Sequence, residues 1–167
     1  MTQIIDSGAE ISSNTIYRYL LWRTWSRSEA SLNFVMLNPS TADANTDDNT
    51  IRRCMKFAER EGFGGITVTN LYALRSRYPG DLVVSYDAEG PENLRYVSEM
   101  VDSGALVAAW GAGAVISGIV PSRAKALIEA RASQPGSTVR CLGTTKHNHP
   151  CHPLYLKTET PLEIWRP

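Results

Sequence analysis

The 167-residue sequence predicts a three-layer α/β fold with a mainly parallel central sheet of about four strands and an N-terminal antiparallel hairpin. Two observations support this fold class. After the hairpin, short apolar runs alternate with helical patterns, which is the chain order of βαβ units. The runs are continuously apolar, as strands are when helices cover both faces of a sheet. We expect one domain, residues 1–167, because no linker, repeat or low-complexity tract divides the chain.

The N-terminal hairpin is predicted from two apolar segments separated by a polar turn. Residues 15–25 (TIYRYLLWRTW) are rich in β-branched and aromatic residues, and residues 32–37 (LNFVML) follow after the turn SRSEAS. We expect these two segments to pair as antiparallel strands. The second is also the first core strand, and it stops abruptly at Asn38.

Helices and strands are expected to alternate in the rest of the core. Apolar residues recur every three to four positions from residue 51, Asp48 can cap this helix, and Gly62 can end it. The remaining strands are expected at residues 66–70, 105–110 and 138–142, and the remaining helices at residues 92–103 and 122–132.

Composition and charge limit the possible functions. The chain has 17 Lys and Arg against 17 Asp and Glu, so non-specific coating of nucleic acid is disfavoured, although a local basic face is not. Three cysteines without a CxxC pair support neither a disulfide framework nor a zinc ribbon. No apolar run can cross a bilayer and no signal-peptide pattern is present, so we expect a cytoplasmic protein without a membrane partner.

Four polar segments rich in proline or glycine follow the predicted core strands. Their sequences are NPSTAD, NLYALR, GAGA and GTTKHNHPCHP. Ligands of open α/β sheets bind beyond the carboxyl ends of the strands. We therefore expect these four loops to form one crevice.

The first loop presents amide and carboxylate side chains. Asn38, held by Pro39, can orient a water or bind the edge of a heterocycle, or it can simply form an Asx turn that ends the strand. The carboxylates that follow, Asp43, Asp47 and Asp48, can supply a general base or bind Mg²⁺. Alternatively, Asp48 caps the helix and the other two are solvated.

The second and third loops offer stacking and close backbone approach. Tyr72, shortly after Asn70, can stack on a planar ligand or pack in the core. Gly111 lies in a small-residue turn that can bind an anion at a helix start, or that merely connects a strand to a helix.

The last loop contains every histidine of the chain. His147, His149, Cys151 and His152 could bind a metal, but the spacing HxHxCH with interrupting prolines is not a recognised ligand pattern. We therefore expect no metal and no cofactor. Instead, His152, fixed by the prolines on either side, is expected to donate a hydrogen bond to a substrate oxygen.

A basic group lies on the first predicted helix and on the second loop. It comprises Arg52, Arg53, Lys56, Arg60, Arg75 and Arg77. These side chains can hold a phosphate backbone if they share a face, or they can form an ordinary solvated surface.

Several segments together resemble a known family. FVMLNPSTADANTDDNTIRRC, ITVTNLYALRSRYP, VAAWG and CLGTTKHNHPCHPLYL are similar, in order and over nearly the whole chain, to a bacterial and phage domain family of unknown function. One departure is Asn49, where that family usually has proline.

The same segments are remotely similar to the uracil-DNA glycosylase superfamily, and this resemblance implies a uracil-DNA-glycosylase-like fold. Asn38 matches the water-positioning amide of that superfamily, and His152 matches its late base-contacting residue. The chain departs from the superfamily at Met36-Leu37, Ser40 and Leu154-Tyr155, which implies a reshaped pocket or base binding without catalysis. The iron-sulfur branches need four cysteines and are excluded.

The resemblance implies a hydrolase that cleaves the N-glycosidic bond of a modified or damaged nucleobase in DNA or in a nucleoside. We expect a monomer. Two alternatives stay open: a non-catalytic domain that binds a modified base or nucleotide, and a metal-dependent hydrolase or nuclease. The expected catalytic residues are Asn38, His152, Asp43 and Asp48. The expected substrate-binding residues are Pro39, Ser40, Thr41, Asn70, Tyr72, Gly111, Thr145 and Pro153, and the expected DNA contacts are Arg52, Arg53, Lys56 and Arg75.

Overall fold

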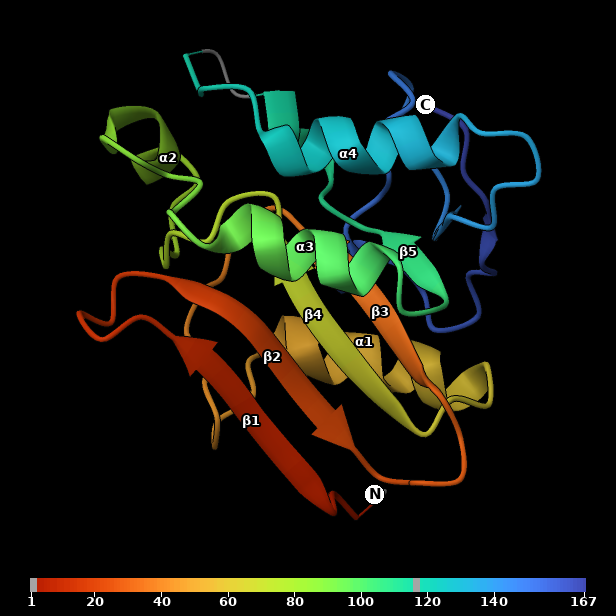
Figure 1. Ribbon diagram of the computed structural model, residues 1–167. Helices are drawn as coiled ribbons and strands as arrows, with labels where there is room; N and C mark the ends of the chain where they lie inside the picture. The colour runs from red at the N-terminus through yellow and green to blue at the C-terminus, as the bar shows by residue number, and fades with distance from the viewer. Residues whose placement is uncertain (1–2, 116–117) are drawn as a thin grey trace.

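The computed structural model describes residues 3–115 and 118–167 and has a mixed α/β fold (Figure 1). Within these residues, seven strands form one sheet in the order β1-β2-β4-β3-β5-β6-β7. The strands are β1 (Asp6–Ile11), β2 (Arg18–Thr24), β3 (Ser31–Met36), β4 (Gly65–Asn70), β5 (Leu106–Ala108), β6 (Arg140–Cys141) and β7 (Glu163–Ile164). The helices are α1 (Asn49–Arg60), α2 (Asp81–Val84), α3 (Asn93–Val101) and α4 (Arg123–Ala132), with short 3₁₀ turns η1 (Ala112–Val115) and η2 (Pro153–Tyr155).

The centre of the sheet is parallel and its edges are antiparallel. β3 pairs parallel with β4 and β5, and β5 pairs parallel with β6, so the four predicted core strands are the parallel ones. β2 and β7 run antiparallel to their inner neighbours. The sheet as a whole is therefore mixed, rather than mainly parallel as expected.

The N-terminal hairpin forms between strands other than those predicted. β1 was not expected as a strand, yet it pairs antiparallel with β2. The predicted pairing of residues 15–25 with residues 32–37 is wrong, because β4 lies between β2 and β3. Both edges of β3 bind parallel partners, so this strand has no free edge for β2. A short polar turn indicates that two strands are near in sequence, but it does not select their partners.

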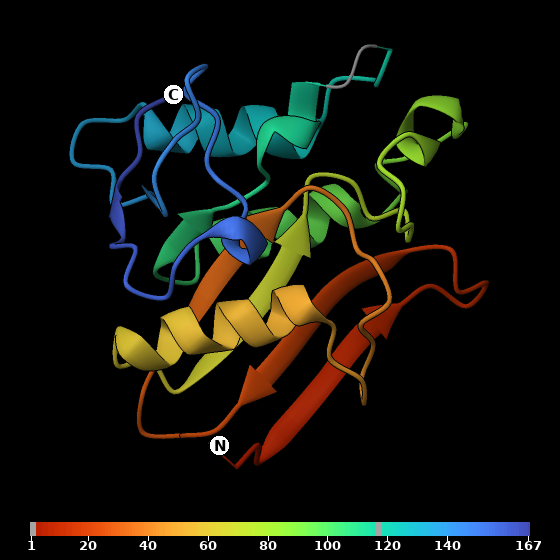
Figure 2. The same ribbon diagram turned by 180° about the vertical axis from the view of Figure 1, so that it is seen from behind.

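Helices cover both faces of the sheet. Figure 1 shows α3 and α4 in front of the sheet, and Figure 2 shows α1 on the opposite face. Each face has its own apolar cluster: Phe34 packs on the α1 side with Phe57, whereas the next residue, Val35, packs on the other side with Val97 and Ile128. Because successive strand residues point to opposite faces, both must be apolar, which explains the continuous runs.

The predicted helix caps agree with the structure. The Asp48 carboxylate accepts a hydrogen bond from Ile51 N–H at 2.9 Å and caps α1, and Gly62 follows the helix with a φ of 80°. The expected helices 92–103 and 122–132 correspond to α3 and α4, and Ser122 caps α4. Within the described residues, no helix has the length and apolar character needed to span a bilayer.

An irregularity between β1 and β2 determines where Arg18 points. Glu10 pairs with Leu20, but the next residue, Ile11, pairs with Arg18, so Tyr19 is an extra residue in β2. Tyr19 stacks on Tyr96 of α3 at 5.3 Å, whereas Arg18 reaches the opposite, α1 side of the sheet. In a regular strand these two side chains would exchange faces. The extra residue therefore brings a positively charged side chain to the side on which α1 lies.

Candidate functional site

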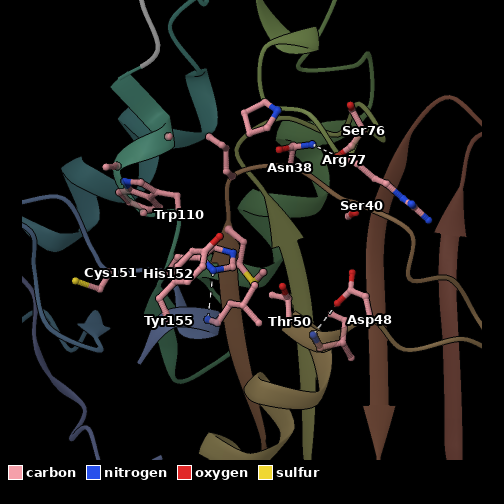
Figure 3. Close-up of a pocket in the computed structure, with 18 of the residues that line it drawn as sticks. Asn38, Ser40, Asp48, Thr50, Ser76, Arg77, Trp110, Cys151, His152 and Tyr155 are labelled. Carbon is pink, nitrogen blue, oxygen red and sulfur yellow. Dashed lines mark hydrogen bonds between the residues drawn. The ribbon is translucent and has the colours of Figure 1, made fainter. Parts of the chain in front are cut away.

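A cavity of about 570 Å³ lies beyond the carboxyl ends of the parallel strands (Figure 3). Each of the loops that follow β3, β4, β5 and β6 contributes to its wall, and the start of α1 and one residue of β2 complete it. In Figure 3, Trp110, His152 and Tyr155 lie on one side of the cavity, and Asp48 and Arg77 lie on the other. The structure thus brings the four predicted loops together.

Asn38 follows the end of β3, and its side-chain amide nitrogen already donates hydrogen bonds to backbone carbonyl oxygens. The Nδ2 group donates to the carbonyl oxygens of Ser76 at 2.9 Å, Pro39 at 3.2 Å and Leu74 at 3.4 Å. These bonds connect the loop after β3 to the loop after β4. Figure 3 shows the amide oxygen of Asn38 on the side away from Ser76. Asn38 therefore presents a hydrogen-bond acceptor to the pocket, which can hold a water or a ligand N–H without removing a proton.

His152 is held in one orientation at the start of η2. Its Nδ1 accepts a hydrogen bond from Leu154 N–H at 3.3 Å. Burial lowers the pKa of His152 below its ordinary value, and the negative charge of Asp48 opposes this in part. The ring is therefore neutral near pH 7, and because Nδ1 accepts, its proton lies on Nε2. His152 can thus donate a hydrogen bond without carrying a charge.

Gly111 allows the loop after β5 to approach His152 closely. Gly111 has a φ of 70°, and a Cβ atom built on it would lie 3.1 Å from the Cβ of His152. Its N–H donates to Pro150 O at 2.8 Å, which joins the two loops. Glycine suits this position for two reasons: it adopts the left-handed backbone conformation without strain, and it has no side chain to crowd His152.

Trp110 forms a rigid wall beside these loops. It is 1% exposed and packs edge-on against Trp165, with ring centroids 5.1 Å apart. Its Nε1 has no hydrogen-bond partner within the described residues.

Asp48 both caps α1 and lines the pocket. Its Oδ1 accepts from Ile51 N–H, and it is the sole acidic residue in the described part of the lining. The second carboxylate oxygen remains for a ligand or a water. Thr50, in the first turn of the same helix, lines the pocket beside it.

Arg18 was not expected in the site. It lines the pocket, is 2% exposed, and donates from Nη1 to Ala42 O at 2.8 Å. Burial lowers the pKa of Arg18 to about 10, so it remains charged at neutral pH. A single arginine in an apolar strand segment carries no motif, and the extra residue that turns it toward the pocket has no sequence signal.

The structure places six of the expected catalytic and substrate-binding residues in the pocket wall and the other six outside it. Those in the wall are Asn38, Ser40, Asp48, Gly111, Thr145 and His152, and those outside it are Pro39, Thr41, Asp43, Asn70, Tyr72 and Pro153.

Asp43 and Tyr72 make hydrogen bonds within the protein that explain why they lie outside the pocket wall. Asp43 accepts from Asn45 and Thr46 N–H, both at 2.9 Å, and these bonds lower the pKa of its carboxyl. Tyr72 is buried, and its hydroxyl donates to Val120 O at 2.7 Å. Asp43 thus forms an Asx turn of its own, although the alternative expected for it was a solvated side chain, and Tyr72 packs in the core, which was one of its two alternatives.

Three of the four arginines and lysines expected to contact DNA make side-chain hydrogen bonds within the protein. Arg53 donates to Thr158 Oγ1 and to Leu156 O, and Arg75 donates to Thr15 O. Lys56 and Arg52 are exposed, although Arg52 donates to Asn49. The basic surface is therefore smaller than the sequence suggests.

The histidine cluster does not assemble a metal site in the part of the chain that the structure describes. There, no three His, Cys, Asp or Glu side chains come together as potential ligands. Asp47, considered as a metal ligand, instead forms an ion pair with Arg23 at 2.8 Å.

The family model described as "Protein of unknown function (DUF1643)" matches residues 18–154 of the chain. The resemblance to a domain family of unknown function is thereby confirmed. No curated protein and no solved structure matches the chain significantly. The matched segment begins at Arg18 and contains the whole described pocket wall except Tyr155 and Leu156.

Proposed function

The chain belongs to the DUF1643 family of proteins of unknown function, and we propose that its pocket hydrolyses the N-glycosidic bond of a nucleobase in DNA or in a nucleoside. A uracil-DNA-glycosylase-like architecture is part of this proposal. The parallel centre of the sheet, covered by helices on both faces, supports it.

One observation carries the proposal: the pocket combines a fixed acceptor with a fixed neutral donor. Asn38 presents its amide oxygen, because its Nδ2 is bound to backbone carbonyls, and His152 presents Nε2–H, because its Nδ1 accepts from Leu154. The edge of a nucleobase carries both kinds of group. Trp110 adds an apolar residue to the wall beside these two groups.

The same groups suit cleavage of the bond between the base and C1′ of the sugar. As this bond breaks, its electron pair goes to the base, positive charge builds on the sugar, and a water oxygen bonds to C1′. The water releases a proton, and the departing base takes one up. A donor aimed at a developing anion is worth about 2.7 to 4 kcal/mol, and His152 is suited to that role.

Asp48 is placed to assist the sugar side of the reaction. Its second carboxylate oxygen can accept the proton of the attacking water or stabilise the positive charge on the sugar. The carbonyl oxygen of Asn38 can position this water but is too weak a base to deprotonate it. Asp48 therefore supplies the basic group that the amide lacks.

A second candidate is a non-catalytic domain that binds a modified base or nucleotide. The engagement of the Asp48 carboxylate as a helix cap favours this alternative, because the oxygen that accepts from Ile51 N–H already has a structural role. Binding would need the Asn38 and His152 contacts but no attacking water.

The proposal is tested by incubating the protein with oligonucleotides and free nucleosides that contain uracil, hydroxymethyluracil, hypoxanthine or phage-type modified bases. Alkali treatment and a gel detect abasic sites in single and double strands, and chromatography detects free base from nucleosides. We expect base release that is lost in His152→Asn, because asparagine can keep the bond to Leu154 N–H but lacks the distal donor. Binding of one substrate without base release would favour the non-catalytic alternative.

A further inference from the structure

Arg18 is a buried cation whose hydrogen-bonding capacity is only partly used. Nη1 donates to Ala42 O, whereas Nε and Nη2 make no hydrogen bond within the described residues. Asp48 and Asp43 are near enough to favour the charge of Arg18, but neither forms an ion pair with it there. An enclosed guanidinium without a direct ion pair is costly, because burial removes its hydration and one hydrogen bond to Ala42 O replaces only part of it.

Arg23, in the same strand, is an arginine whose N–H groups have partners within the protein. It is also 2% exposed, but its Nε donates to Asp47 Oδ1 at 2.8 Å. Its remaining N–H groups donate to the carbonyl oxygens of Gly8, Trp22 and Asp43. The incomplete pairing of Arg18 is therefore particular to the residue that faces the pocket.

The rest of the pocket wall also favours an anion. Within the described lining, two guanidinium groups, Arg18 and Arg77, stand against one carboxylate, Asp48, while His152 is neutral. Thr50 lies in the first turn of α1, where backbone N–H groups have no partner within the helix. The wall thus carries net positive charge although the whole chain is neutral.

We propose that Arg18 binds the phosphate of a nucleotide, so that nucleoside monophosphates are the substrate class of this pocket. This inference rests on the proposed function and narrows its substrate. The Nε and Nη2 groups of arginine form a parallel pair of donors that matches two phosphate oxygens. No carboxylate occupies this edge of Arg18 within the described residues.

The enclosure of Arg18 favours a terminal phosphate over a phosphodiester. A polymer must leave the site in two directions, which an almost fully buried guanidinium does not allow. A cavity of about 570 Å³ is a suitable size for a small ligand of this kind. The internal contacts of Arg53 and Arg75 agree with this, since these are two of the four residues expected to contact a DNA backbone.

The test is titration calorimetry of the wild-type protein with deoxynucleoside and ribonucleoside 5′-monophosphates, the matching nucleosides, inorganic phosphate and a single-stranded oligonucleotide. We expect one monophosphate to bind at least about tenfold more tightly than its nucleoside, and inorganic phosphate to compete with it. Arg18→Met should bind nucleoside and monophosphate equally. Arg95→Met, which removes the same charge from the exposed surface of α3, should keep the preference.

Equal affinity of nucleoside and monophosphate in the wild type would overturn the inference without any variant. Retention of the preference in Arg18→Met, or tighter binding of the oligonucleotide than of every monophosphate, would also overturn it. Base release, measured in the same samples, separates the two proposals. Tighter binding of the monophosphate without base release would support phosphate binding by Arg18 and contradict the proposed hydrolase activity. Base release without tighter binding of the monophosphate would support the hydrolase activity and contradict phosphate binding by Arg18.

Discussion

Arg18 and Arg23 are equally buried in β2 and donate to adjacent carbonyls, those of Ala42 and Asp43, but only Arg23 has a carboxylate partner. The two residues are five positions apart, so a regular strand would point them to opposite faces. The extra residue at Tyr19 brings them to the same side of the sheet. Arg23 thus makes an ion pair and several backbone hydrogen bonds within the protein. Arg18, which lines the pocket, makes a single hydrogen bond within the described residues.

This difference predicts opposite effects on stability. Arg23→Met leaves Asp47 and three carbonyls without their partner and should lower the free energy of unfolding by about 3 kcal/mol. Arg18→Met removes a buried charge that has no ion-pair partner within the described residues, and it should leave the ligand-free protein at least as stable as the wild type. Denaturant unfolding of both variants measures this. A loss in Arg18→Met as large as that in Arg23→Met would show that Arg18 is structural.

Asp48→Asn should separate the helix cap from the chemistry. Asparagine caps a helix about as well as aspartate, so the melting temperature should change little. The basic carboxylate oxygen is lost, and the rate of base release should fall about 100-fold or more. Asp48→Ala is the comparison, because it should lose the same activity and in addition about 1 kcal/mol of stability. Full activity in Asp48→Asn would exclude Asp48 from the reaction.

Gly111→Ala should disturb His152 through its backbone. The added methyl group would meet the Cβ of His152 at 3.1 Å in a strained left-handed residue. Gly62→Ala is the matched control, since Gly62 has a similar φ of 80° but nothing within 4 Å of the added Cβ. Both should lose about 1 kcal/mol of stability from strain, but only Gly111→Ala should also lower base release. Equal activities of the two variants would contradict the packing role of Gly111.

The lowered pKa of His152 predicts a stability change with pH. Below the ordinary pKa of about 6.5, the unfolded chain binds a proton on this histidine more readily than the folded protein does. The folded state therefore loses stability as the pH falls from that value to the lower folded pKa, and it loses no more below. His152→Asn should lose less stability than the wild type over this pH range, because asparagine does not bind a proton there. Melting temperatures between pH 8 and pH 5 test the difference, and parallel curves for the two proteins would refute it.

The parts of the fold that local patterns determine could be predicted from the sequence. Asp48 as a cap and the four parallel strands are examples, because capping chemistry and continuous apolar runs act over a few residues. The partner of β2 could not be predicted, because pairing depends on which strand edges remain free in the finished sheet.

The candidate site shows the same division. Asn38 and His152 lie in the pocket wall because loops at the carboxyl ends of parallel strands meet there. Arg18 was missed because its orientation depends on one extra residue in a strand. Asp43 follows the same strand as Asn38, but its carboxylate accepts hydrogen bonds from the backbone N–H groups of Asn45 and Thr46 and lies outside the pocket wall.

The central claim is most directly tested by the origin of the oxygen atom in the products. The protein is incubated in ¹⁸O-labelled water with the nucleotide or oligonucleotide that binds most tightly, and the products are examined by mass spectrometry. Hydrolysis of the N-glycosidic bond predicts unlabelled free base and a sugar with one ¹⁸O at C1′. Intact substrate, or label found only on phosphate, would contradict it.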